Sequence, residues 1–563
     1  MRFLHLLCVL CGLLSPAFTL DRESFTFTRY DLDVRVEPEQ QRLAVRGKIS
    51  LRNDSAQPQR NAALQISSTL DWRSIKAEGK PVQFVSQVYT SDIDHTGALS
   101  EAIVALPHDI KSGESIELEI GYEGTIPQSA TRLTRVGTPE EVAKHTDWDQ
   151  ISPVFTGVRG VGYVAWYPVA IEAQSLEQGN EMFLALGRWK GRQAQSGMHV
   201  RISVTGDDGI TPAALIPTLP QCPMSIEQTG QAREVSADCN DSPMGLTTPA
   251  FFAGNYTALD HASLRVWHMP QDRAAATTFA QAADAVLPFL TEWFGSLRDK
   301  AEVVELPDPK AAPFESDSVL LTPLGDGDLK LTRLSLAHGL THAAFSSARP
   351  WISEGVAHFA QALWLEKQSG REAALDYLGL HRAAILDTEK MSDNANARSL
   401  VAATDEVLYR SKAAYVWWML RDMAGDDAVR RALRNYKPEQ DSEPAYFQRL
   451  LSVQTNRDLE WFFDDWVYRD RGLPDFRVMS AFPRDLLNGG FVTTVTVENL
   501  GAAGAEVPIT LRMRGGEVTK RLEVRGKSKA TIRILTPAKP VEVVVNDGSV
   551  PESDMTNNML KIE

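Results

Sequence analysis

The stretch LSLAHGLTHAAFSSARPWISEGVAHFAQALW, residues 334–364, decides the fold. His338 and His342 stand four residues apart, so on a helix both imidazoles lie on one face and can reach the same ion. The residues ARP at 348–350 break this helix, and WISEGVAHFAQALW then has the pattern of a second amphipathic helix that brings Glu354 back to the histidines. Because zinc prefers nitrogen and oxygen donors, the stretch predicts one zinc ion bound by these three side chains.

Two other interpretations of these residues stay open. A pair of histidines four apart also occurs as packed or solvated side chains that bind nothing. His358, one turn beyond Glu354, is either a partner of a ligand or an ordinary helix residue, and we favour the ordinary residue.

The rest of the chain divides by its hydrophobic pattern. From Phe25 to about Asp260, short runs such as YDLDVRVEP alternate apolar and polar residues, which indicates a mainly antiparallel β domain. From about residue 270, segments rich in alanine and leucine have helical spacing, with a short strand at AEVVELPD. After Pro474 the alternation returns in five short runs, which predicts a small β-sandwich of immunoglobulin-like type.

We therefore expect a multidomain α+β protein in which no single core spans all 563 residues. The predicted parts are a signal peptide at 1–19, an N-terminal β domain at 20–262, a mainly helical domain at 263–473 and a C-terminal β-sandwich at 474–563. The net charge of −15 disfavours nucleic acid as a partner, because a phosphate backbone attracts basic surfaces. The sequence makes no prediction about the oligomeric state.

The N-terminus predicts export. MRFLHLLCVLCGLLSPAFTL combines a basic start, an apolar run from Leu6 to Leu14 and small residues after it, which is typical of a secretory signal peptide. A membrane span needs about 20 apolar residues, so an uncleaved anchor is the less favoured alternative. We expect a secreted or periplasmic protein whose mature chain has no integral membrane span.

Cys222 and Cys239 are the cysteines that remain after removal of the signal. In an oxidising compartment two such residues most simply form one disulfide, and a free buried pair is the alternative. Zinc binding by these two alone is disfavoured, because a structural zinc site needs four ligands.

The motif WISEGVAHF, with the histidine pair upstream, resembles the aminopeptidase N family of gluzincin zinc metallopeptidases. The likeness extends from about Arg29 to Leu473 and includes FFAGNY at 251–256 and WVYRDRGLPDF at 466–476. It implies a saddle-like β domain, then a thermolysin-like catalytic domain and a β-sandwich. It also places the zinc ligands of the family on His338, His342 and Glu354.

The resemblance implies roles for two further side chains. The tyrosine that stabilises the oxyanion falls on Tyr409, although Lys412 comes one place later than in the family, so Tyr415 is a rival and either can be a core aromatic. The family's loop that binds the free amino terminus of the substrate corresponds to KAAPFESDSVLLTP, which places Glu315 in that role. A solvated loop glutamate is the alternative for Glu315.

The chain departs from the family at two points. Only eleven residues separate His342 from Glu354, fewer than in the family. Gly339 occupies the position of the general-base glutamate, which contributes roughly 10²–10⁴-fold in rate by moving a proton from water to the leaving amine. Glycine cannot do this, and in a helix interior it costs about 1 kcal/mol relative to alanine. A small residue does leave room for another group to approach the metal.

Three hypotheses follow. The first is a secreted zinc-binding protein that binds a peptide or a protein and whose ordinary hydrolysis is impaired by Gly339. The second is an active zinc metallopeptidase that uses the metal-activated water and Tyr409 without the usual base. The third keeps the fold without the metal and leaves His338 and His342 as polar core residues.

Overall fold

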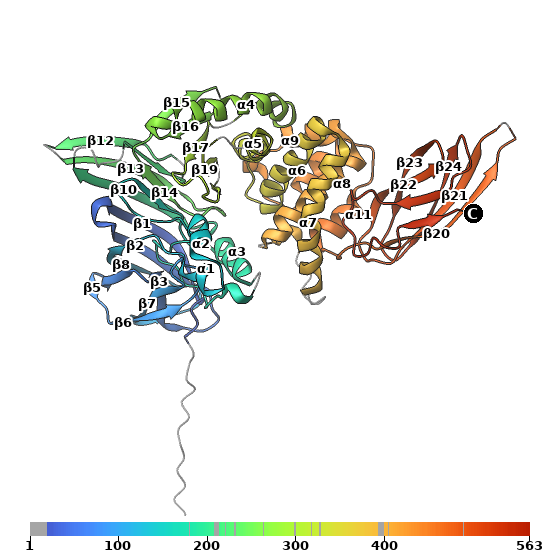
Figure 1. Cartoon of the computed structure of the whole chain (residues 1–563). Helices are drawn as coiled ribbons and strands as arrows, with labels where there is room; N and C mark the ends of the chain where they lie inside the picture. The colour runs from blue at the N-terminus through green and yellow to red at the C-terminus, as the bar shows by residue number, and fades with distance from the viewer. Residues whose placement is uncertain are drawn as a thin grey trace, which may run out of the picture.

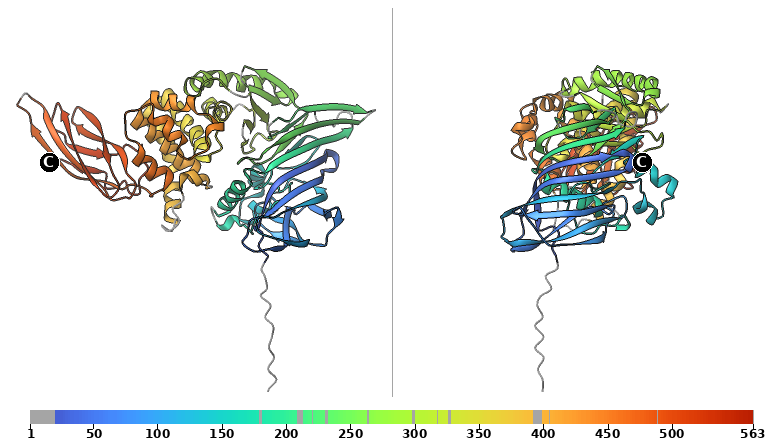
Figure 2. Two further views of the ribbon diagram at one scale, coloured as in Figure 1. Left: turned by 180° about the vertical axis from the view of Figure 1, so that it is seen from behind. Right: turned by 90° about the vertical axis from the view of Figure 1, so that its left-hand side faces the viewer.

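The computed structural model describes residues 20–178, 181–207, 213–219, 221–229, 232–262, 264–297, 300–316, 318–325, 328–391, 399–403, 405–487 and 489–562. The predicted signal peptide at 1–19 lies outside these residues. A β-rich N-terminal part, a helical middle part and a C-terminal β part follow one another along the molecule (Figure 1; Figure 2). The chain is a multidomain α+β protein, as the sequence predicts. The domain boundaries themselves stay predictions.

The largest N-terminal sheet has eight strands in the order β12-β13-β10-β1-β2-β8-β4-β5. In chain order these strands are β1 (Phe25–Glu37), β2 (Arg42–Asn53), β4 (Leu70–Ala77), β5 (Lys80–Pro81), β8 (Ser115–Thr125), β10 (Gly197–Asp207), β12 (Met224–Thr229) and β13 (Ala232–Pro243). β1 pairs in parallel with β10, and the other neighbours are antiparallel. From Tyr30 to Val36 every second residue is buried, because successive side chains of a strand point to opposite faces.

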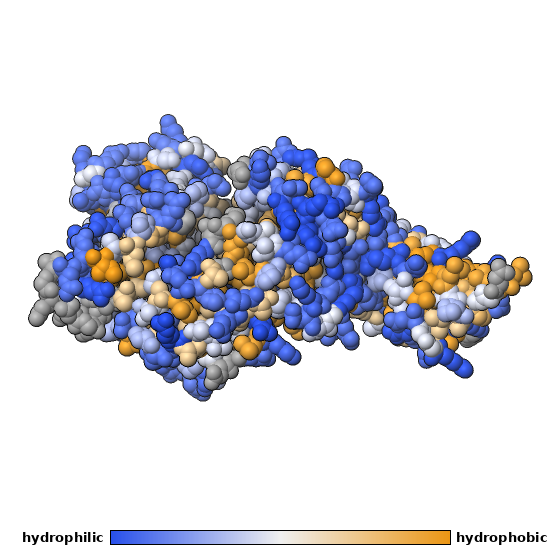
Figure 3. Space-filling view, turned by 90° about the horizontal axis from the view of Figure 1, so that it is seen from above, coloured by the Kyte–Doolittle hydropathy of each residue, from blue (hydrophilic) through white to orange (hydrophobic). Residues whose placement is uncertain are grey.

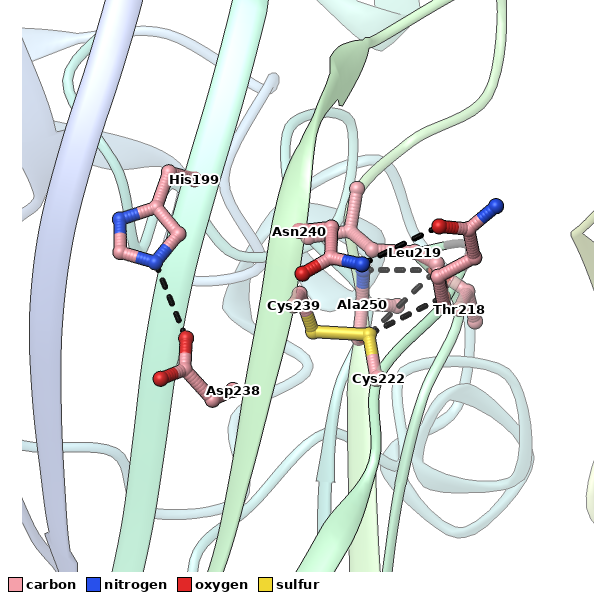
Figure 4. Close-up of a disulfide and its surroundings, with 9 residues drawn as sticks. His199, Thr218, Leu219, Cys222, Asp238, Cys239, Asn240 and Ala250 are labelled. Atoms are coloured by element: carbon pink, nitrogen blue, oxygen red, sulfur yellow. Dashed lines mark hydrogen bonds and ion pairs between the residues drawn. A yellow bond between two sulfur atoms is a disulfide. The ribbon is translucent and has the colours of Figure 1, made fainter.

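Two three-stranded sheets complete the N-terminal part, in the orders β3-β7-β6 and β11-β14-β9. Their strands are β3 (Gln59–Ser67), β6 (Phe84–Thr90), β7 (Ala98–Ile110), β9 (Phe155–Val158), β11 (Ala214–Pro217) and β14 (Phe251–Gly254). The helices α1 (Thr131–Arg135), α2 (Glu140–Thr146) and α3 (Glu181–Gln193) belong to the same part. A disulfide joins Cys222, just before β12, to Cys239 in β13 (Figure 4).

A five-stranded sheet begins the middle part, in the order β15-β16-β17-β19-β18. Its strands are β15 (Thr257–His261), β16 (Leu264–His268), β17 (Ala301–Glu305), β18 (Phe314–Ser316) and β19 (Val319–Thr322). The short strand predicted at AEVVELPD is β17, but the prediction missed its neighbours. These strands have three to five residues, too few for a period of two to be visible in the sequence. Glu315 lies in β18, at the edge of this sheet.

Helices form the rest of the middle part, and the helical spacing predicted from about residue 270 is confirmed by α4–α9. The helices are α4 (Arg273–Phe294), α5 (Leu329–Ala344), α6 (Pro350–Ser369), α7 (Arg371–Met391), α8 (Ala413–Ala424), α9 (Asp426–Asn435), α10 (Tyr446–Ser452) and α11 (Glu460–Phe463). Two π-helical turns, Val407–Lys412 and Asp464–Tyr468, precede α8 and follow α11. Within the described residues, no helix combines the length and the apolar character needed to cross a membrane.

Residues at the helix ends and one contact from α8 position the short connection between α5 and α6. α5 begins after Asp328, whose side chain accepts a hydrogen bond from the backbone N–H of Lys330 at 2.8 Å and caps the helix. Pro350 opens α6, where its fixed φ suits the first turn and its missing N–H removes no helical bond. Trp351 is fully buried, and its carbonyl oxygen accepts a bond from Trp417 Nε1 at 3.1 Å. A connection of five residues is therefore sufficient to bring α6 back alongside α5.

The C-terminal part consists of two sheets, in the orders β20-β21-β24 and β23-β22-β25-β26. Their strands are β20 (Phe476–Asp485), β21 (Phe491–Asn499), β22 (Ala505–Met513), β23 (Gly516–Val524), β24 (Lys529–Thr536), β25 (Glu542–Val545) and β26 (Met559–Lys561). The prediction of five strands missed β20, whose apolar residues do not alternate cleanly, and β26, which has three residues. The immunoglobulin-like topology stays a prediction. Apolar residues gather on the surface of this part (Figure 3), and Phe482 and Leu535 are among those exposed.

Candidate metal centre

His338 and His342 lie together on one face of α5. Their Nε2 atoms are 3.3 Å apart, and both side chains are largely buried, with exposed fractions of 12% and 8%. Burial lowers the pKa of His338 to about 3, and the nearby His342 acts in the same direction. A neutral imidazole is the form that binds a metal ion, so His338 is in the protonation state that a metal site requires.

Glu354 reaches the same place from α6. Its Oε2 atom lies 3.8 Å from His338 Nε2, and its Oε1 atom lies 3.7 Å from His342 Nε2. Metal–ligand bonds of about 2.0–2.1 Å in a tetrahedron separate neighbouring donor atoms by about 3.4 Å. The structure therefore brings the three predicted ligands together, with each histidine facing a different oxygen of Glu354 at 3.7–3.8 Å.

Close packing of α6 on α8 explains the glycine that follows Glu354. A Cβ atom on Gly355 would lie 2.7 Å from Ala413 Cβ and 2.9 Å from the indole of Trp417. Any larger residue would push the two helices apart. Gly355 thus sets the distance between α6 and α8, and with it the position of Glu354 on α6.

Glu315 joins this group from the edge strand β18. Its Oε2 atom lies 3.6 Å from His338 Nε2, and the candidate ligand atoms of Glu315, His338 and His342 lie within 4.8 Å of one another. The carboxylate stands over Gly339, where an added Cβ would be 3.3 Å from Glu315 Oε1. A small cavity lined by Gly339, Glu315, Glu302 and neighbouring apolar residues adjoins this contact. The sequence placed Glu315 near the site, but not over the missing base.

Arg410 is a charged neighbour of Glu354 that the sequence pattern did not predict. Its Nε atom donates to Glu354 Oε2 at 3.1 Å, and its Nη1 atom donates to Glu406 at 3.1 Å. Burial raises the pKa of Glu354, but the positive charge of Arg410, followed by the histidines, holds it well below its usual value. The only signal in the sequence was the position of Arg410 directly after Tyr409.

The two tyrosines considered for the oxyanion role lie in different places. Tyr409 belongs to the π-helical turn, and the guanidinium of Arg410 is 5.8 Å from its ring centre. Burial raises the pKa of Tyr409, and the charge of Glu406 raises it further. Tyr415 is 1% exposed in the core of α8. Of the two, Tyr409 is the one next to a residue that contacts Glu354.

His358 is part of the cluster rather than an isolated helix residue. Its ring centre is 4.7 Å from that of His338, and its ligand atom lies within 4.8 Å of those of His338 and Glu354. Its Nδ1 atom is 2.9 Å from the hydroxyl of Tyr377. Burial lowers the pKa of His358 well below its usual value. The sequence favoured an ordinary helix residue at position 358 and did not predict these contacts. The helical period shows that His358 lies one turn from Glu354, but it does not show which side chains of other helices His358 contacts.

Comparisons with known proteins bear on the fold. No protein family model matches the chain, and a comparison with curated proteins gives no match. The fold is similar to that of an aminopeptidase A from Legionella pneumophila solved in complex with aspartic acid, with a TM-score of 0.59 and 10% identity over 94% of this chain. This chain spans 59% of the length of that protein.

An M1 zinc metallopeptidase from Deinococcus radiodurans also matches, with a TM-score of 0.44 and 16% identity over 80% of this chain and 95% of that one. The similarity to the Legionella protein confirms the aminopeptidase-like fold that the sequence predicts. At this identity it shows the fold alone.

Proposed function

We propose that the chain is a secreted zinc-binding protein with an aminopeptidase N-like fold that binds a peptide or a protein segment and has lost ordinary peptide hydrolysis. The observation that carries this proposal is the spacing of 3.3–3.8 Å among the donor atoms of His338, His342 and Glu354, next to a residue 339 that has no side chain. The donor set of two imidazoles and one carboxylate is one that zinc prefers.

The residues of this site have separable roles in the proposal. His338 and His342 bind the ion through Nε2, and Glu354 supplies an oxygen and one negative charge. A zinc ion held there would act as a Lewis acid on a peptide carbonyl and lower the pKa of a water molecule. Gly339 can neither accept a proton nor deliver one, so the step that normally depends on the base is not supported at this position.

Tyr409 favours the alternative, an active zinc metallopeptidase. The phenol belongs to the same turn as Arg410, which contacts Glu354. A hydroxyl donor that stabilises a developing oxyanion retains part of the rate enhancement when the base is missing. In this alternative Tyr409→Phe lowers the turnover of the protein.

A metal analysis combined with a peptidase assay tests the proposal. We expect about one zinc per natural chain by elemental analysis, loss of that zinc in His342→Ala, and negligible turnover of aminoacyl amides. Robust turnover that a chelator abolishes would establish the alternative. A natural chain that holds no metal, and whose melting temperature a chelator does not change, would contradict both.

Secretion rests on the predicted signal peptide at 1–19 and on the cysteine pair, Cys222 and Cys239, outside it. Expression of the full chain with its natural N-terminus, followed by fractionation and N-terminal sequencing, tests this part. We expect a mature chain that begins near residue 20 and is found outside the cytoplasm. A full-length chain retained in the cytoplasm would contradict it.

A further inference from the structure

We infer that Glu315 is a fourth protein ligand of the zinc site, so that the chain itself fills the coordination position that a zinc peptidase leaves open for water. This inference rests on the proposed zinc site and adds the residue that closes it. It also explains why residue 339 is a glycine, which the loss of the general base does not explain.

The first argument is distance. Glu315 Oε2 lies 3.6 Å from His338 Nε2, between the 3.3 Å that separates the two histidines and the 3.8 Å from His338 to Glu354. These spacings are close to the edge of about 3.4 Å expected for donor atoms that share a zinc ion. Glu315 forms one group with His338 and His342, and Glu354 forms another with His338 and His358, each with ligand atoms within 4.8 Å of one another, so His338 is the donor that both carboxylates approach.

The second argument is the space over Gly339. A Cβ atom at this position would already be 3.3 Å from Glu315 Oε1, so a longer side chain would displace the carboxylate. Glycine is unfavourable within a helix, and α5 continues for five residues beyond it to Ala344. The absence of a side chain at residue 339 is what lets β18 bring a carboxylate to the histidines.

The third argument is charge. Two neutral imidazoles and two carboxylates balance the charge of a zinc dication, whereas His338, His342 and Glu354 alone leave one positive charge. That remaining charge would lie close to Arg410, which donates to Glu354 at 3.1 Å. A second carboxylate therefore makes the site more favourable for the dication in a largely buried environment.

A closed shell changes what the metal does. Structural zinc sites have four protein ligands, whereas catalytic sites have three and an open position. With Glu315 bound, the ion would tie the edge strand β18 to α5 and α6, which come from a different layer of the same part of the chain. The site would then stabilise this contact rather than act on a peptide bond.

Cobalt-substituted protein tests the inference. The natural chain is loaded with Co²⁺, its visible absorption spectrum is recorded, and azide is added. We expect the spectrum to be insensitive to azide, because no coordination position is open, and Glu315→Ala to become azide-sensitive. We also expect Glu315→Gln to weaken zinc binding by more than about 100-fold, beyond the 10–100-fold typical of a residue that only orients a ligand.

Glu302→Gln is the matched control. Glu302 lies on β17 of the same sheet, lines the same cavity, and has an exposed fraction of 29% against 25% for Glu315. We expect this variant to keep both the zinc affinity and the azide insensitivity of the natural chain. Far-ultraviolet circular dichroism verifies that each variant is folded.

Two results overturn the inference and are distinguishable. Azide binding to the cobalt-loaded natural chain, with unchanged zinc affinity in Glu315→Gln, removes Glu315 from the ligand set and leaves the proposed zinc site intact. A natural chain that takes up neither zinc nor cobalt contradicts the proposed function and this inference together.

Discussion

Gly339 and Glu315 are complementary: the carboxylate of Glu315 stands over the glycine, 3.3 Å from where a Cβ atom on residue 339 would lie. The position that carries the general base in zinc peptidases is therefore covered by an acid from β18. Glutamates at both positions would compete for the same space and repel each other. The behaviour of the site thus depends on this pair rather than on residue 339 alone.

Restoring the base requires changing both members of the pair. We expect Gly339→Glu alone to weaken zinc binding and to show no hydrolysis, because its carboxylate is forced against Glu315. The double variant Gly339→Glu, Glu315→Ala should turn over aminoacyl amides above the natural chain, within the roughly 10²–10⁴-fold that a base contributes. The control is Gly379→Glu, at a helical glycine of α7 where a Cβ meets nothing within 4 Å. Full activity in the single variant would contradict the complementarity.

Removing the charge of Arg410 should tighten zinc binding. At about 5 Å and an effective dielectric constant of about 20, two unit charges repel by about 3 kcal/mol, and zinc carries two. A partner that orients a ligand contributes only about 10–100-fold to affinity, so repulsion dominates. We expect Arg410→Met to lower the zinc dissociation constant by at least about tenfold, measured by competition with a chelating dye. Arg410→Lys keeps the charge and should change it little, and weaker binding in Arg410→Met would refute the prediction.

Enlarging Gly355 should separate α6 from α8. A methyl group at this position meets Ala413 at 2.7 Å, and overpacking of this kind destabilises a core by about 1–3 kcal/mol. We expect Gly355→Ala to lower the melting temperature and to weaken zinc binding, because Glu354 moves with α6. Gly379→Ala, where space is open, should leave both unchanged or raise the stability slightly. Equal melting temperatures of Gly355→Ala and Gly379→Ala would show that the packing of α6 on α8 accommodates the methyl group, which would contradict the prediction.

Glu552 should make the stability depend on pH. It is fully buried, accepts bonds from Phe476 N at 3.0 Å and Asn546 Nδ2 at 2.6 Å, and its burial raises its pKa from 4.5 to about 7. The folded chain then holds this proton more tightly than the unfolded chain. The protonated carboxyl of Glu552 therefore adds to the free energy of unfolding. This contribution is complete below pH 4.5 and is lost as the pH rises through 7. Each unit by which folding raises the pKa corresponds to about 1.4 kcal/mol.

Urea unfolding of the full chain at pH 5 and pH 8 measures this effect. Glu552→Gln, which imitates the protonated carboxyl, should reduce the difference in the free energy of unfolding between the two pH values. The same difference in the natural chain and in the variant would exclude Glu552 as its source.

Much of the fold was predictable because apolar residues recur with a regular period in helices and in long strands. The pattern of α4–α9 is sustained over ten or more residues, and β1 alternates along its length. The short strands β16, β18 and β19 were not predictable, because three to five residues carry too little pattern. β16 and β19 are held in place by pairing with β17, and β18 by pairing with β19, and a local sequence pattern does not contain these contacts.

The sequence by itself determined the spacing of His338 and His342 and the helix break before Glu354, because the period of a helix and the fixed φ of proline act locally. Only the tertiary structure decided what surrounds them. Arg410 contacts Glu354 from 56 positions away along the chain, and Glu315 reaches Gly339 from a separate sheet. Such contacts depend on how whole layers pack, and that packing determines whether the metal position is open or covered.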